Sequence, residues 1–298
     1  ERTLVLVSSK SGGTIEMRSV LDAVLDHFEM YPKTEKIPSH LVAITDPGSD
    51  LEKRAHDEGW RACFLGEPTV GGRFSALSVF GLVPAALVGI DLGGFLGHAK
   101  DAERVCSEDS IDNPAITLAS FLYDNYLNGR DKFSFLTPKR GRVLGLWIEQ
   151  LVAESLGKQG VGILPNIELD ALLLTEDPKD RSVITYQTKT DLWDERKNFD
   201  MSLAYLDSAI PRLSFRIDSV LDLAEHFVMW EYATAMCGYL MKRCPFDQPD
   251  VASTKAAALK FLAEGCPKPD FTENFIGNVN MGEAEVTIAP CIKSDTLM

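Results

Sequence analysis

The feature that most constrains the fold is a short apolar segment that leads through a glycine- and hydroxyl-rich loop into a helical pattern. Residues 3–8 read TLVLVS, a run typical of a strand buried in a parallel sheet. The loop at residues 9–16 follows at once, and apolar residues then recur at helical spacing as far as residue 28. A strand, a loop and a helix in this order begin a βαβ unit, so the pattern predicts a parallel α/β sheet.

The same alternation of strands and helices continues along the chain and restarts near residue 132. We therefore expect two α/β units, residues 1–130 and residues 131–298. Strands are expected at 40–45, 61–65, 133–136, 183–187, 213–217 and, in the tail, 283–288. Helices are expected at 51–58, 75–87, 114–127, 146–156, 221–241 and 251–262, with a loop in the polar stretch 188–199.

Composition excludes several classes of partner. A net charge of −14 over 298 residues argues against a nucleic-acid-binding surface, which needs clustered basic residues. The longest apolar run, residues 79–97, contains Pro84, Asp91 and several glycines, so it is a poor membrane span. The six cysteines form no CxxC pair, which favours reduced thiols and a cytoplasmic protein. No His, Cys and Asp residues have the spacing of metal ligands, so we expect neither a metal nor a cofactor.

The loop at residues 9–14 is a candidate phosphate site. Ser9, Ser11 and Thr14 offer hydroxyl donors, and Lys10 and two glycines lie among them. A helix N-terminus directs free backbone N–H groups at an anion, and glycines let the backbone approach it closely. The alternative is an ordinary βα turn with capping residues. A turn needs only one cap, so the density of donors favours phosphate. The loop lacks the GxxxxGK[ST] pattern of a P-loop.

A second candidate site involves the amphipathic helix around residues 147–158. Gln150 and Glu154 are four residues apart and share one helix face, and Lys158 follows the helix end at Gly157. We interpret Lys158 as a favourable charge at that end. A solvated surface helix would carry similar residues. Arg73 follows twin glycines that would let its guanidinium approach a ligand, although an arginine exposed on a loop fits the pattern equally well.

Four segments in order resemble the phosphoglucose isomerase (glucose-6-phosphate isomerase) family of the sugar isomerase (SIS) fold. They are SSKSGGTIE (8–16), VGGRFSALSVFGL (70–82), EQLVAESLGK (149–158) and CPFDQPDVASTK (244–255). The wording of residues 230–255 is most similar to the isomerase part of fused transaldolase–phosphoglucose isomerase proteins. The resemblance implies two SIS-type, flavodoxin-like parallel-sheet units, the first without its first strand. It also implies a homodimer or a completing segment, upstream of Glu1 or in a companion chain.

The resemblance assigns roles to individual residues. It implies an aldose–ketose isomerase that interconverts glucose 6-phosphate and fructose 6-phosphate through a cis-enediolate, without metal or cofactor. Three residues fall on catalytic positions: Glu154 as the base, Arg73 beside the enediolate oxygens and Lys255 at the ring oxygen. The residues implied in substrate and phosphate binding are Ser9, Lys10 (main chain), Ser11, Thr14, Gln150 and Gln248.

One departure from the family keeps other functions open. The segment that carries the family's ring-opening histidine is not found, and His226 is expected to be a buried structural residue. A sugar-phosphate-binding regulatory module without turnover is therefore one alternative. Another is that the chain is one part of a bifunctional transaldolase–isomerase.

Overall fold

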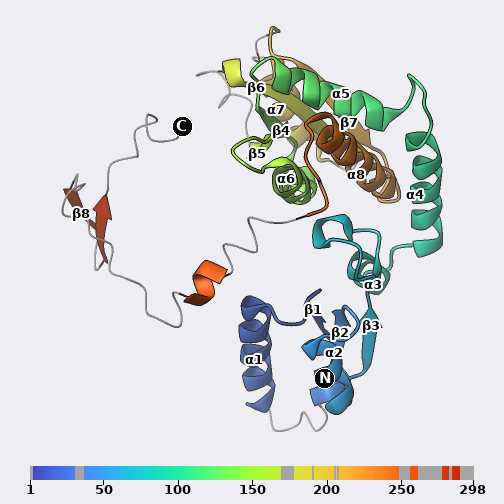
Figure 1. Ribbon diagram of the computed structural model, residues 1–298, viewed down its shortest axis with the longest axis vertical. Coiled ribbons are helices and arrows are strands. Elements are labelled where there is room, and N and C mark those ends of the chain that lie inside the picture. The colour runs from blue at the N-terminus through green and yellow to red at the C-terminus, as the bar shows by residue number, and fades with distance from the viewer. Residues whose placement is uncertain are drawn as a thin grey trace. The chain divides into compact units, whose positions relative to one another are not determined.

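A computed structural model describes residues 3–30, 37–168, 178–189, 191–204, 206, 208–247, 256–260, 277–281 and 284–288 (Figure 1). The chain divides into two units, residues 1–247 and residues 248–298. Two separate parallel sheets lie in the first unit. The prediction of an α/β fold with parallel sheets and flanking helices is confirmed.

The first sheet contains three parallel strands in the order β1-β2-β3. Their bounds are β1 Val5–Ser8, β2 Leu41–Thr45 and β3 Ala62–Leu65. The strand β2 lies in the middle and is buried along its whole length, as its unbroken apolar sequence predicts. Among the described strands, β1 pairs with β2 alone, in the register Val5 to Leu41.

Two helices cover one face of this sheet: α1 (Ile15–Glu29) follows β1, and α2 (Asp50–Asp57) follows β2. Alternate residues of β2 point to that face, where Leu41 and Ala43 pack with Leu21, Leu51, Ala55 and Trp60. Beyond β3 the chain forms a 3₁₀ turn at Gly72–Phe74 and then α3 (Val79–Leu87), which contacts β2. This order leaves the loop between β1 and α1 at the carboxyl end of the sheet.

The second sheet contains four parallel strands in the order β5-β4-β6-β7. Their bounds are β4 Lys132–Leu136, β5 Leu164–Glu168, β6 Arg181–Thr188 and β7 Arg212–Ile217. The chain leaves β4 through α6 (Arg142–Leu156), and it leaves β6 and β7 through α7 (Trp193–Ala204) and α8 (Asp222–Leu240). The first strand therefore lies between the second and the third, which is the flavodoxin-like order.

The largest core lies between this sheet and a group of helices. The helices α4 (Leu92–Cys106) and α5 (Pro114–Leu127) both pack on α8, as Figure 1 shows. The core joins fully buried residues of β4, α6 and α8 with those of α5: Leu118, Phe133, Phe135, Ile148, Leu151 and Trp230. Helices that precede residue 130 thus share a core with the sheet that follows it, and the domain boundary at that residue stays a prediction.

The predictions were wrong about one loop and missed three elements, which are the strand β5, the helix α4 and the strand β8 (Gly277–Met281). The stretch 188–199 was expected to be a loop, but α7 begins within it at Trp193. This helix buries only Phe199 among its described residues, so its sequence shows little apolar periodicity. The strand β5 was missed because it contains Pro165 and Asn166, and it tolerates the proline as an edge strand. The helix α4 was missed because three glycines lie in its first six residues.

In the second unit, β8 (Gly277–Met281) pairs antiparallel with β9 (Ala284–Ile288), which confirms the strand expected at 283–288. Residues 256–260 are helical, within the helix expected at 251–262. Across the described parts of both units, no helix has the length and apolar character that crossing a bilayer requires.

Candidate functional site

The loop at residues 9–14 lies between β1 and the first turn of α1. Ser9 is buried, and its Oγ lies 3.0 Å from Oγ1 of Thr14. Thr14 is the N-cap residue of α1, but its side chain makes no capping hydrogen bond. The first N–H groups of a helix have no acceptor within the helix, and Thr14 directly precedes these groups in α1. The loop thus has the composition of an anion site.

Contacts with β2 and α2 fix the shape of this loop. The Thr45 hydroxyl donates to the Ser9 carbonyl oxygen over 2.7 Å, and the Ser9 amide donates to the carbonyl of Ile44 over 3.0 Å. Gly12 has a φ of +68°, and a Cβ at this position would lie 2.9 Å from the backbone nitrogen of Leu51. A side chain at residue 12 would therefore push the loop away from α2.

The side chains of Lys10 and Ser11 have different surroundings. The Lys10 ammonium pairs with both carboxylate oxygens of Asp46 at 2.7 and 2.8 Å, and it donates to the Glu67 carbonyl over 2.9 Å. Its charge is thus committed to the protein, which is consistent with the prediction that Lys10 contributes its main chain. Ser11 is exposed, and its Oγ accepts a hydrogen bond of 3.4 Å from the amide of Gly13.

Arg73 lies inside the protein, contrary to the alternative of a surface arginine. Its side chain has 0% exposure. The Nε donates to Ser155 Oγ over 2.7 Å, and Nη2 donates to the carbonyls of Pro245 and Asp247 over 2.5 and 3.0 Å. Burial lowers the pKa of Arg73, while the charges of Glu154 and Asp247 raise it. An arginine starts from so high a pKa that the guanidinium stays charged at neutral pH.

Glu154 meets this guanidinium from the last turn of α6. Its Oε1 lies 3.4 Å from Nη1 of Arg73, and its Oε2 accepts a hydrogen bond of 3.2 Å from the side-chain amide of Gln150. The side chain of Glu154 is 21% exposed, so it is partly open to solvent while its Oε1 faces the buried cation. The helical spacing of four residues predicted the contact between Gln150 and Glu154.

The end of α6 also binds the turn at residues 244–247. Lys158 is buried and donates to the Cys244 carbonyl, the Asp247 carboxylate and, over 2.9 Å, the Asp247 carbonyl. That last oxygen also accepts from Arg73. Two cations therefore hold this turn against α6, and Lys158 fixes a loop as well as favouring the helix end.

His226 has the structural role that its apolar neighbours predicted. Its Nδ1 lies 2.9 Å from the hydroxyl of Tyr186, which in turn accepts a hydrogen bond of 2.8 Å from the indole of Trp230. Burial lowers the pKa of His226, so the neutral ring is favoured. His226, Tyr186 and Trp230 are thus linked by hydrogen bonds within the core of the second sheet.

The structure gathers the predicted residues into two clusters. Ser9, Lys10 and Thr14 lie around the loop after β1, and Arg73, Gln150 and Glu154 lie around the end of α6. Sequence reasoning missed Ser155 and the turn at residues 244–247 as partners of Arg73. Gln248 and Lys255 lie outside the described residues.

Comparison with known proteins gives the chain its relatives. No family model matches the chain. A protein named glucose-6-phosphate isomerase from Desulfitobacterium hafniense is 40% identical over 161 residues, which are 53% of this chain and 30% of that protein. One named probable glucose-6-phosphate isomerase from Methanococcus maripaludis is 31% identical over 296 residues, 88% of this chain and 66% of that protein.

A solved structure shares the fold. The crystal structure of a glucose-6-phosphate isomerase from Chlamydia trachomatis superposes with a TM-score of 0.69 at 20% identity, over 90% of this chain and 61% of that one. The chain spans about 30% of the length of the first curated relatives that it matches. The sequence identity and the shared fold agree with the motifs around Arg73 and Glu154: the chain belongs to the glucose-6-phosphate isomerase family.

Proposed function

We propose that the protein interconverts glucose 6-phosphate and fructose 6-phosphate, with Glu154 as the base that moves a proton between C1 and C2. The observation that carries this proposal is the carboxylate of Glu154, which is held between Arg73 at 3.4 Å and Gln150 at 3.2 Å and remains partly open to solvent. A general base must be fixed in direction and still reach the substrate. Glu154 meets both conditions.

Arg73 acts through Glu154 in this proposal. Its side chain has no exposed surface, and its donors point at Glu154, Ser155 and the turn at residues 244–247. It therefore positions the carboxylate. It also contributes a buried positive charge near the enediolate, where negative charge develops during the reaction. A buried cation acts more strongly than an exposed one because water screens it less.

The phosphate of the substrate is assigned to the loop at residues 9–14. Ser9 and Thr14 direct their hydroxyls at each other beside the first turn of α1, and Ser11 is exposed next to them. These donors, together with the positive end of the helix, favour an anion over a neutral sugar hydroxyl. Gln248 and Lys255 keep the substrate-binding and ring-opening roles that the resemblance gives them.

The experiment compares isomerase activity and fructose 6-phosphate affinity in the wild type and Glu154→Gln. The substitution keeps the shape and the contact with Gln150 but removes the proton acceptor. Turnover is expected to fall by about 10²–10⁴-fold with little change in affinity. Glu149→Gln, an exposed neighbour on α6, is the matched control and should keep full activity. A wild type that binds fructose 6-phosphate without turnover would instead identify a regulatory module.

A further inference from the structure

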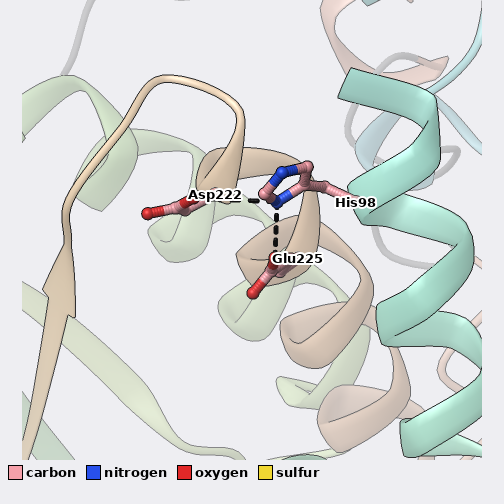
Figure 2. Close-up of side chains that lie close together, drawn as sticks. All are labelled: His98, Asp222 and Glu225. Atoms are coloured by element: carbon pink, nitrogen blue, oxygen red, sulfur yellow. Dashed lines mark hydrogen bonds and ion pairs between the residues drawn. The ribbon is translucent and has the colours of Figure 1, made fainter. Parts of the chain in front are cut away.

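A histidine and two carboxylates from two helices meet at the start of α8, away from the residues assigned to isomerisation. Nδ1 of His98, on α4, lies 2.6 Å from Oε1 of Glu225 and 3.7 Å from Oδ1 of Asp222 (Figure 2). The three ligand-type atoms all lie within 4.8 Å of one another. Figure 2 shows the imidazole ring directed from α4 toward the two carboxylates on the first turn of α8.

Close packing of the two helices brings these groups together. Gly94 precedes His98 by one helical turn, so both lie on the same face of α4. A Cβ at Gly94 would lie 3.2 Å from Cδ1 of Leu221, the residue before α8. Asp222 and Glu225 are three residues apart and share the face of α8 that meets His98. The spacing therefore depends on two packed helices and not on a loop.

One carboxylate is fixed by further hydrogen bonds. Oδ2 of Asp222 accepts from the amides of Asp218 and Ser219, each over 2.9 Å, and Oδ1 accepts from the Ser219 hydroxyl over 2.9 Å. Such outer contacts orient a ligating carboxylate and are typical of metal sites. His98 and Glu225 are partly exposed, so an ion could enter and water could complete its coordination.

From this geometry we propose that His98, Asp222 and Glu225 bind one divalent first-row transition ion that clamps α4 to α8. A set of one imidazole and two carboxylates suits Zn²⁺ and its neighbours, whereas Ca²⁺ takes oxygen ligands alone. Metal–ligand bonds of about 2.0–2.2 Å place adjacent ligand atoms roughly 3 Å apart, which small side-chain rotations achieve here. A ligating Nδ1 carries no proton, so the neutral ring would bind the ion as the tautomer with its proton on Nε2.

The site was not visible in the sequence because His98 and Glu225 are 127 residues apart. It would act on structure and not on the sugar. An ion that binds only the folded state stabilises that state and raises the temperature of unfolding. Because α8 packs on α4, α5 and α6, a clamp at its first turn would stabilise the core of the second sheet.

The test is titration of the protein with ZnCl₂ by calorimetry, with thermal unfolding followed in parallel. Cys244 is an exposed thiol and a competing zinc ligand, so every protein carries Cys244→Ser. The Cys244→Ser protein without further changes, called the background protein, is expected to bind one Zn²⁺ and to unfold at a higher temperature when the ion is bound. His98→Gln and Glu225→Gln should each weaken this binding at least tenfold and abolish the shift in unfolding temperature.

The matched control is His56→Gln, which removes an exposed histidine from α2 and should leave zinc binding unchanged. Unfolding curves without metal establish that each variant is folded, and Glu225→Gln replaces His98→Gln if the latter loses helix packing. Zinc binding of equal strength in the background protein and in the folded His98→Gln or Glu225→Gln variant would overturn the proposal. So would a background protein that binds no zinc.

Discussion

Arg73 donates a buried hydrogen bond of 2.7 Å from Nε to the hydroxyl of Ser155, 82 residues further along the chain. Ser155 directly follows Glu154, so the guanidinium binds the side chain next to the carboxylate that it also contacts at 3.4 Å. These two contacts connect the loop after β3 to the end of α6. The direction of the proposed base follows from this connection.

Arg73→Lys should destabilise the protein although the charge is kept. A lysine ammonium cannot reproduce the planar fork that serves Ser155, Pro245 and Asp247, so the Ser155 hydroxyl and the Pro245 carbonyl lose a buried charged donor. Hydrogen bonds from a charged group contribute about 1.5–3 kcal/mol each, so we expect a loss of about 3 kcal/mol in the free energy of unfolding, measured in urea.

Arg104→Lys is the matched control for this change. Arg104, in the last turn of α4, forms an exposed pair with Glu108, four residues later and beyond the helix end, and exposed pairs of this kind contribute less than about 0.5 kcal/mol. An equally small loss in the free energy of unfolding for Arg73→Lys would show that the hydrogen bonds of the buried guanidinium do not stabilise the protein.

Local sequence patterns predicted most of the elements but not all of the site. The strand–loop–helix pattern at residues 3–28 and the amphipathic helix around residue 150 were predicted correctly because each is defined by neighbouring residues. The contact between Arg73 and Glu154 had no such signal, and only the resemblance to a family suggested a shared site.

The missed parts depend on contacts between distant residues. Ser155 looks like an ordinary helix residue, and its role depends on an arginine 82 positions away. The carbonyl of Pro245, 172 positions from Arg73, is a backbone group that no side-chain pattern reveals. The helix α7 was missed because its burial rests on one phenylalanine, which leaves no periodic apolar signal.

Gly12→Ala should destabilise the loop more than Gly48→Ala does. Both glycines have a positive φ, +68° and +79°, which costs an alanine about 1–2 kcal/mol. At Gly12 the new Cβ would also lie 2.9 Å from Leu51 N and from Ser49 Cβ, whereas nothing lies within 4 Å at Gly48. We expect a loss of about 3 kcal/mol for Gly12→Ala and about 1 kcal/mol for Gly48→Ala in urea unfolding. Equal losses would mean that α2 does not confine the loop.

Glu231 should make stability fall as pH rises. Burial raises the pKa of Glu231 from 4.5 to about 8, and among the described residues its Oε1 has no hydrogen-bond partner. Below pH 4.5 both states hold this proton, so the burial of Glu231 costs no ionisation energy there. Between pH 4.5 and pH 8 the carboxyl is ionised in the unfolded state but still protonated in the native state. The free energy of unfolding therefore falls by up to about 1.4 kcal/mol per pH unit.

The variant Glu231→Gln cannot ionise, so its stability relative to the wild type should rise between pH 5 and pH 8. Urea unfolding at several pH values measures the difference, and Glu149→Gln on the exposed face of α6 is the control. A difference for Glu231→Gln that does not change with pH would contradict the burial of this carboxyl.

The double variant Ser9→Ala, Thr14→Val should weaken the binding of fructose 6-phosphate. The two hydroxyls are hydrogen-bonded to each other, so removing both at once leaves no unpaired hydroxyl in the loop from this bond. Thr14 also makes no side-chain capping bond, so the start of α1 should stay intact. Two lost hydrogen bonds to an ionised phosphate, at about 1.5 kcal/mol or more each, predict an affinity at least tenfold lower by calorimetry. The pair Ser107→Ala, Thr117→Val removes one hydroxyl just after α4 and one from α5, and it should bind as the wild type does. Equal affinity of the two double variants for fructose 6-phosphate would mean that the hydroxyls of Ser9 and Thr14 do not bind the phosphate and that the phosphate binds elsewhere.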